Sequence, residues 1–249
     1  SIFNNFDGHC ILKAYKNDKE IYMHFNAANL GFLSIAAHGH ADALSFTLNL
    51  NGHPFLVDSG TYTYHSSPKW RNYFMGTLSH NTLRIDKKNQ AMITGPTMWK
   101  NHYNSKILEF NNNFKNLFFV KATHDGYNDK ANHIRSICFD KNKLELVIKD
   151  EIMINDNNSH FIEIPFHFHP NVSLTKISNN SFEAKLSKNI SSFITFDQVL
   201  SKKIINGQEI PVLGWYSNKF NYKEKSSVIY CSGQLSGNYT IETKIKIML

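Results

Sequence analysis

The alternation of apolar and polar side chains is clearest at residues 44–50, where Leu, Phe, Leu and Leu are separated by Ser, Thr and Asn. This period of two is typical of a strand with one buried face. Asn51-Gly52 follows, and since a type I′ turn needs positive φ at both central residues, this pair predicts a hairpin. Residues 55–57 then form the returning strand.

Similar short patterns continue along the chain, separated by Asn, Ser, Lys and Pro turns. The expected strands are 8–25 (a hairpin around Asn17-Asp18), 81–86, 117–122, 133–139 paired with 143–150, 161–169, 172–177, 181–186, 191–196, 226–231 and 239–249. Residues 117–122 read as a fully buried strand, and 161–196 continues a meander. No long stretch shows an apolar period of 3.6. The sequence predicts an all-β fold, a large antiparallel β-sandwich of two sheets with few or no helices, in one domain over residues 1–249.

The composition agrees with a folded chain, because 249 residues with 41% hydrophobic and 13% aromatic content supply enough apolar surface for a core. No apolar run approaches the roughly 18 to 20 residues needed to span a bilayer. Lys plus Arg number 27 and Asp plus Glu 20, which favours a polyanionic partner: an acidic polysaccharide, nucleic acid, or nothing specific. The basic residues are scattered, so no nucleic-acid surface is indicated.

The chain begins at Ser1, which is neither an initiator Met nor a basic signal-peptide start. We therefore expect a fragment or a processed form that lacks an N-terminal part. Cys10, Cys138 and Cys231 lie far apart and match no CxxC spacing. Buried or free thiols are the expected outcome, and one disulfide with one remaining thiol is the alternative.

Residues that bind metals or move protons are concentrated between His38 and Thr82. His38 and His40 would share a face on an extended strand, and His40, Asp58 and His80 make a His/Asp/His set of the kind that Zn²⁺ accepts. The spacing alone is weak support, because the chain has 13 histidines. Surface or core histidines remain the alternative.

The predicted hairpin register separates two members of this set. It places Asp58 across from Ser45, and His40 lies five residues further on, about 17 Å away at the usual strand rise. The two side chains can share a ligand only if the chain curls back before Asp42 or a bulge shifts the register.

Aromatic residues and one arginine follow Asp58 in the sequence: Tyr62, Tyr64, Trp70, Arg71 and Tyr73. They are either aromatic cover over a sheet end or a sugar platform, in which rings stack on pyranoses and the Arg fork pairs with a carboxylate or sulfate. His124, in the string HDGY, belongs to a turn by composition, and packing of its ring and that of Tyr127 inside the protein is the alternative.

Several strings in this chain carry a family resemblance: HGHADALSF, FLVDSGTYTY, RNYFMGTLSHNT, HDGY, FHFHP and GWYS. In this order they resemble the C-terminal β-sandwich domain of the heparinase II/III-like polysaccharide lyases. The combination of HxHxD, DSGTY and SHNT is much more specific than any one string.

The resemblance implies a zinc held by His40, Asp58 and His80, mainly in a structural role, and hence a bend or bulge between His40 and Leu44. It implies that His38 faces the substrate. A tyrosine of the sandwich lines the cleft in relatives, and we expect it to be Tyr62, Tyr64 or Tyr73. Further substrate contacts are expected from Trp70, Arg71 and His124.

The implied activity is β-elimination on a uronic-acid-containing polysaccharide, in a periplasmic or secreted protein. In the family the main catalytic groups come from an N-terminal helical toroid, which this chain lacks, so we expect it to form one wall of the cleft and to be inactive alone. The alternative is a non-catalytic carbohydrate-binding or structural β-sandwich module.

Overall fold

Antiparallel strands dominate the computed structural model, which describes residues 2–114 and 116–249. The N-terminal sheet has the order β1 (Ile2–Phe6), β2 (His9–Lys16), β3 (Lys19–Asn26), β4 (Phe46–Leu50), β5 (His53–Leu56). Asn17 and Asp18 after β2, like Asn51 and Gly52 after β4, all have positive φ. Both predicted hairpins are therefore confirmed, with the backbone that a type I′ turn requires.

A second sheet has the order β14-β15-β16-β23-β12-β11-β10-β9. Its strands are β9 (Ser105–Phe114), β10 (Leu117–His124), β11 (Ala131–Asp140), β12 (Glu145–Ile154), β14 (Ser173–Lys176), β15 (Ser181–Ser187), β16 (Ile190–Phe196) and β23 (Tyr239–Met248). The predicted hairpin of β11 and β12 is confirmed. The expectation of a fully buried strand at 117–122 is wrong, because β10 buries alternate residues and keeps its other face partly exposed.

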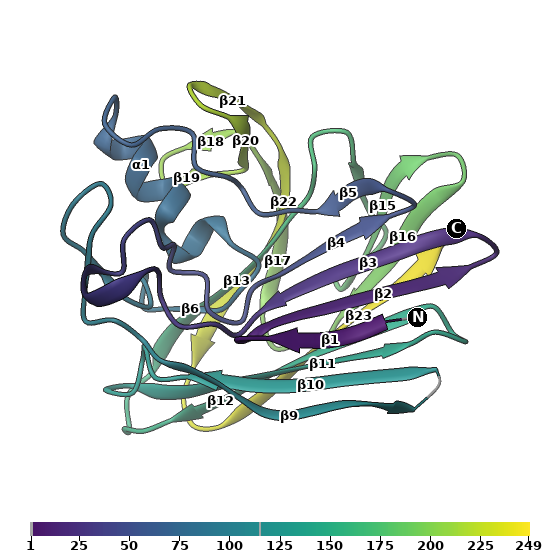
Figure 1. Cartoon of the computed structure of the whole chain (residues 1–249), viewed down its shortest axis with the longest axis horizontal. Coiled ribbons are helices and arrows are strands. Elements are labelled where there is room, and N and C mark those ends of the chain that lie inside the picture. The colour runs from purple at the N-terminus through teal and green to yellow at the C-terminus, as the bar shows by residue number, and fades with distance from the viewer. Residues whose placement is uncertain (1, 115) are drawn as a thin grey trace.

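A four-stranded sheet adjoins the end of the N-terminal sheet and has the order β17-β22-β13-β6; its strands are β6 (Arg84–Ile85), β13 (His160–His167), β17 (Ser201–Asn206) and β22 (Ser227–Leu235). Leu56 bridges to Phe168, and the Val57 amide donates to the His167 carbonyl at 2.9 Å. The described strands thus form two layers, with β9 to β12 below β1 to β5 in Figure 1.

Two sequence expectations are corrected here. The meander over 161–196 is broken at its start, because β13 pairs with β22 and β6 and not with the strands that precede or follow it. Side chains on both faces of β13 are buried, which requires a central position in the fold. The strand expected at 81–86 is limited to β6.

The core fills the space between the layers. In β23, Ile241, Thr243, Ile245 and Ile247 are buried as their alternation predicts. The cysteines are unpaired, and two of them, at positions 10 and 231, are buried, in agreement with the expected free thiols.

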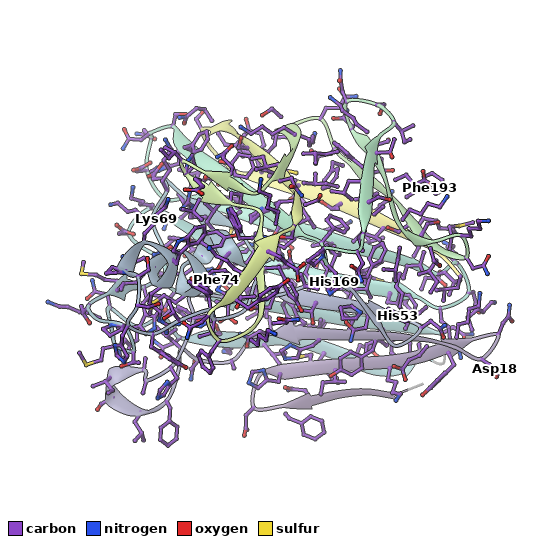
Figure 2. The ribbon with its side chains drawn as sticks, turned by 90° about the horizontal axis from the view of Figure 1, so that it is seen from above. Asp18, His53, Lys69, Phe74, His169 and Phe193 are labelled. Atoms are coloured by element: carbon purple, nitrogen blue, oxygen red, sulfur yellow. The ribbon has the colours of Figure 1, made fainter. Side chains whose placement is uncertain are left out.

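Helical structure in the described residues is short: η1 (Leu33–Ile35), α1 (Pro68–Met75) and η2 (Thr77–Ser79). None of these helices has the length and apolar character that a membrane crossing requires. Lys69 and Phe74 of α1 lie at the end of the molecule opposite Asp18, in the β2–β3 turn (Figure 2). Short strand pairs complete the chain: β7 (Met92–Ile93) with β8 (Trp99–Lys100), β18 (Gln208–Glu209) with β19 (Val212–Leu213), and β20 (Trp215–Lys219) with β21 (Tyr222–Lys225).

Candidate functional site

The segment before β4 is a series of turns and not a strand. His38 has φ of 59°, and the Ser45 amide donates to the Asp42 carbonyl at 3.0 Å, which closes a turn just before β4. The expected bend between His40 and Leu44 is therefore present. Because the backbone is not extended at His38, the strand argument for a shared face of His38 and His40 does not apply.

Neighbouring loops hold this segment in place. The Trp99 indole donates to the Gly39 carbonyl at 2.9 Å, and the Tyr103 hydroxyl donates to the His40 carbonyl at 3.3 Å. A Cβ on Gly39 would lie 2.8 Å from the Cα of Gly31, so only glycine permits this approach. The backbone at His40 is thus fixed from two sides.

Asp58 lies two residues beyond β5, next to Val57, whose amide donates to the His167 carbonyl of β13 at 2.9 Å. Leu50 pairs with His53 as the simple register predicts, but Leu48 pairs with Leu56, so the register shifts by one residue. One oxygen of the Asp58 carboxylate then accepts the amide of Gly60 at 2.8 Å. This shift would place Asp58 across from Phe46 and not Ser45, so the bend after His40, and not the bulge, removes the separation that the ideal hairpin predicted.

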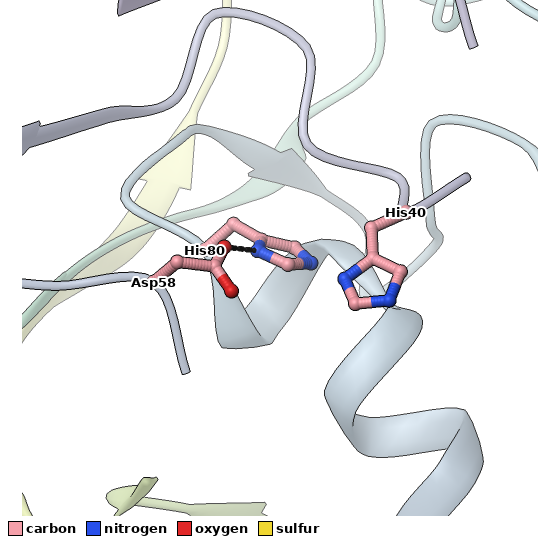
Figure 3. Close-up of side chains that lie close together, drawn as sticks. All are labelled: His40, Asp58 and His80. Atoms are coloured by element: carbon pink, nitrogen blue, oxygen red, sulfur yellow. Dashed lines mark hydrogen bonds and ion pairs between the residues drawn. The ribbon is translucent and has the colours of Figure 1, made fainter. Parts of the chain in front are cut away.

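His80 follows η2 and completes the group. Its Nδ1 lies 2.5 Å from Asp58 Oδ2, and its ring centroid lies 5.2 Å from that of His40. Figure 3 shows the His80 ring between the Asp58 carboxylate and the His40 ring. His80 is fully buried, and its Nε2 has no hydrogen-bond partner within the described parts of the chain.

Charge and burial act in opposite directions on these groups. Burial alone would lower the pKa of His80, but the carboxylates of Asp58 and Asp42 outweigh it and raise that pKa. Burial alone would raise the pKa of Asp58, but the charge and hydrogen bond of His80 hold it well below its usual range. Burial, with His80 beside it, lowers the pKa of His40 to about 3, so its ring is neutral at pH 7.

The three side chains fit a divalent metal ion. One ligand atom from each of His40, Asp58 and His80 lies within 4.8 Å of the others. Histidine nitrogens and a carboxylate oxygen are among the atoms that hold Zn²⁺ in proteins, so these three residues would supply a suitable ligand set. A partnerless buried Nε2 and a neutral imidazole are the donors that such an ion requires.

His38 and Tyr64 form a second, more exposed group. His38 Nδ1 lies 3.3 Å from the Tyr64 hydroxyl, with the two rings perpendicular. The guanidinium of Arg71 lies over the ring of Tyr64, 4.6 Å from the ring centre. The structure therefore brings together three of the residues expected to contact substrate.

Other expected site residues pack within the protein. Lys223 Nζ lies 4.3 Å from the centre of the Trp70 ring and 5.1 Å from that of Tyr62, so a side chain of the protein itself occupies one face of each ring. Tyr73 is buried, and burial raises its pKa to about 12. Its hydroxyl lies 3.5 Å from the Trp215 amide.

His124 is also withdrawn from the surface. It is 3% exposed, its Nε2 lies 3.2 Å from His133 Nδ1, and its Nδ1 accepts the Gly126 amide at 3.1 Å. Both ring nitrogens are committed, so the substrate contact expected of His124 is replaced by a structural role. His124 is the last residue of β10, and the turn that the composition predicts begins after it.

Sequence reasoning missed the buried polar residues that position the loops. Asn81 donates to the carbonyls of Phe46 and Val57 at 2.8 and 2.9 Å, and thereby ties β4 to the end of β5. Arg135 Nη1 donates to the carbonyls of Leu44 and Asn81 at 2.8 and 2.5 Å. The sequence did carry a signal, because Arg135 stands an even number of residues before Ile137 and Phe139 and therefore lies on the same buried face of the strand.

Comparisons with known proteins agree with this architecture. An antiparallel sandwich of the same fold occurs in a heparan sulfate lyase from Pedobacter heparinus (TM-score 0.77, 17% identity, covering 97% of this chain and 35% of that chain). It also occurs in a heparinase III structure (TM-score 0.78, 19% identity, covering 99% and 36%). By fold, the class of molecule is thus the antiparallel β-sandwich that these structures contain.

The sequence identifies the family. The profile described as "Heparinase II/III-like, C-terminal" matches residues 8–245, and the chain belongs to this family. A heparin-sulfate lyase of Bacteroides thetaiotaomicron is 32% identical over 122 residues, which cover 48% of this chain and 15% of that protein. The chain spans about a third of the length of the solved structures it matches.

Proposed function

We propose that this chain is the C-terminal part of a polysaccharide lyase that cleaves a uronic-acid-containing polysaccharide by β-elimination. The observation that carries the proposal is the exposed His38 ring next to Tyr64 in a heparinase II/III-like chain. His38 stands two residues before His40, which forms a cluster with Asp58 and His80. Relatives named as heparin-sulfate and heparan sulfate lyases support the same class of substrate.

Elimination next to a uronate requires three actions. A base removes the C5 proton, a positive or hydrogen-bonding group neutralises the carboxylate as the enolate develops, and an acid protonates the leaving oxygen. His38 is suited to the second action, because its ring is exposed and Tyr64 holds its Nδ1 edge, leaving Nε2 to face substrate. Tyr64 is the cleft tyrosine in this proposal, since Tyr62 and Tyr73 are packed against the protein.

His40, Asp58 and His80 are the proposed ligands of a zinc ion. When bound, the ion would cross-link the turn before β4, the end of β5 and the residue after η2, and so would hold His38 in place. Structural zinc sites contribute directly to folding free energy, which fits this role.

The remaining catalytic groups are proposed to come from a helical domain of a longer chain, because the chain matches only about a third of each solved relative. The substrate is a large acidic polymer, so the natural protein is proposed to act in the periplasm or outside the cell.

The test is to incubate the product of the complete gene, and separately these 249 residues, with heparan sulfate, alginate and hyaluronan. Absorbance of the unsaturated uronate reports elimination. We expect product from the complete protein and little from the shorter chain. Rapid turnover by the 249 residues alone would refute the divided site. Glycan binding without product from either protein would instead favour the carbohydrate-binding alternative.

A further inference from the structure

Arg71 carries hydrogen-bonding capacity that the protein does not use. The residue lies in α1 and is 1% exposed. Its Nε donates to the Pro96 carbonyl at 2.6 Å. Nη1 and Nη2 are both buried and have no partner among the described residues. A guanidinium has five N–H donors and stays charged, so burying most of them without an acceptor is costly.

The arginine lines a cavity of about 290 Å³, near the lower end of the range for small-ligand pockets. The other lining residues are Tyr64, His65, Pro68, Asn72, Ile93, Thr94, Gly95 and Pro96. None of them is acidic, and no salt bridge within residues 2–114 and 116–249 involves Arg71. Among the described residues, the positive charge of Arg71 therefore has no counter-ion.

The orientation of the arginine favours one kind of ligand. Tyr64 covers the face of the guanidinium at 4.6 Å, and the Pro96 carbonyl takes Nε. What remains is the edge with Nη1 and Nη2, a fork that matches the two oxygens of a carboxylate or a sulfate. A role in packing alone is a poor explanation, because apolar side chains of similar volume usually stabilise a core as well as a buried ion does.

We propose that Arg71 binds a second acidic group of the polysaccharide, a carboxylate or sulfate on a sugar adjacent to the one that faces His38. This inference rests on the proposed function and deepens it. Tyr64 contacts both His38 and Arg71: its hydroxyl lies 3.3 Å from His38 Nδ1, and its ring packs against the Arg71 guanidinium. The substrate class is then a polymer with acidic groups on neighbouring sugars, and not one in which a uronate alternates with a neutral sugar.

Binding calorimetry on the complete protein tests this with fragments of equal length from heparan sulfate, alginate and hyaluronan. We expect Arg71→Gln to weaken binding of the preferred acidic glycan by about 10- to 100-fold, the range for a hydrogen-bonded charge, with hyaluronan binding unchanged. A preference for heparan sulfate identifies a sulfate at Arg71, and a preference for alginate identifies a carboxylate.

Lys69→Gln is the matched control, because it removes the same charge from the same helix at an exposed position outside the cavity lining. Its effect should stay within about twofold. If Arg71→Gln does not fold, Arg71→Lys decides, since a lysine keeps the charge but not the fork. Weaker binding at an unchanged melting temperature supports the subsite, and unchanged binding overturns it.

The two proposals fail in different ways. Equal glycan affinities of wild type and the Arg71 variants overturn the subsite even if wild type forms unsaturated product. Loss of binding in Arg71→Gln, with no product from any protein, supports the subsite while the lyase proposal fails.

Discussion

Replacing Asp150 by Asn removes the negative charge on which a buried polar network depends. Asp150 is 1% exposed and accepts Arg135 Nε at 2.7 Å, Arg135 Nη2 at 3.0 Å and His133 Nε2 at 2.7 Å. In the variant, the Arg135 guanidinium stays buried without its counter-ion. The neutral amide also presents an N–H to at least one of these donors.

The expected cost follows from the burial. Removing one partner of a buried ion pair costs about 3 to 5 kcal/mol. Burial alone would raise the pKa of Asp150, but Arg135 and His133 lower it from 3.8 to about 2. This shift means that the ionised carboxylate contributes roughly 2 to 3 kcal/mol to the free energy of unfolding at neutral pH. Because the folded pKa is depressed, this contribution is present above pH 3.8 and is lost as the pH falls towards 2.

Urea and thermal unfolding measure the effect. For a chain of this size, 3 to 5 kcal/mol lowers the melting temperature by roughly 6 to 20 °C. Glu151→Gln is the control on the adjacent residue of β12, because Glu151 pairs with Lys121 at 2.7 Å on the partly exposed face. That pair is worth about 0 to 1 kcal/mol. A loss below about 1 kcal/mol in Asp150→Asn, or a loss equal to the control, would refute the reasoning.

The same variant connects the core to the candidate site. Arg135 donates hydrogen bonds to the carbonyl of Leu44, which lies in the Asp42–Ser45 turn, and to that of Asn81, which directly follows His80. We therefore expect Asp150→Asn to weaken zinc binding in equilibrium dialysis, whereas Glu151→Gln leaves it unchanged. Equal zinc affinity in both variants would show that the network supports the fold without positioning the ligands.

Three further predictions follow from local geometry. Saturating Zn²⁺, at about 100 times its Kd, should stabilise wild type by roughly 2.7 kcal/mol and His40→Ala hardly at all; an unchanged thermal shift contradicts the ligand set. Hydrogen bonds to Asp86 and Asp156 raise the pKa of His160 above 6.5, so its stabilising effect is full below pH 6.5 and is lost as the pH rises through the folded value. Unfolding of wild type and His160→Gln should differ most in mildly acidic buffer, and a difference that grows above neutral pH contradicts this sign. Gly60→Ala places a Cβ 2.0 Å from the Ser217 carbonyl oxygen, whereas Gly52→Ala adds only backbone strain of about 1 kcal/mol. The first variant should therefore lose several-fold more stability than the second, and equal losses would contradict the close approach.

Much of the fold follows from local patterns. Alternation in β4 and β23 and the Asn51-Gly52 turn depend on neighbouring residues only, so they are readable from the chain. The position of β13 is different, because its partners β22 and β6 are distant in sequence and no local pattern selects them. The helix α1 was missed because eight residues are too few to display a helical period.

The candidate site shows the same division. Residue types and the family strings pointed to His40, Asp58 and His80, and the structure brings these three side chains together. Our proposal of Tyr64 over Tyr62 and Tyr73 needed the structure, because burial and ring contacts depend on packing partners from other segments.

By itself, the sequence determined which faces of the strands are buried, where the hairpins turn and which residue types are available for chemistry, since these depend on composition and short-range geometry. The tertiary structure alone decided how the Asp42–Ser45 turn brings His40 to Asp58, and which side of Arg71 is left without a partner. Both depend on contacts between segments far apart in the chain, where a shift of one residue changes which atoms meet.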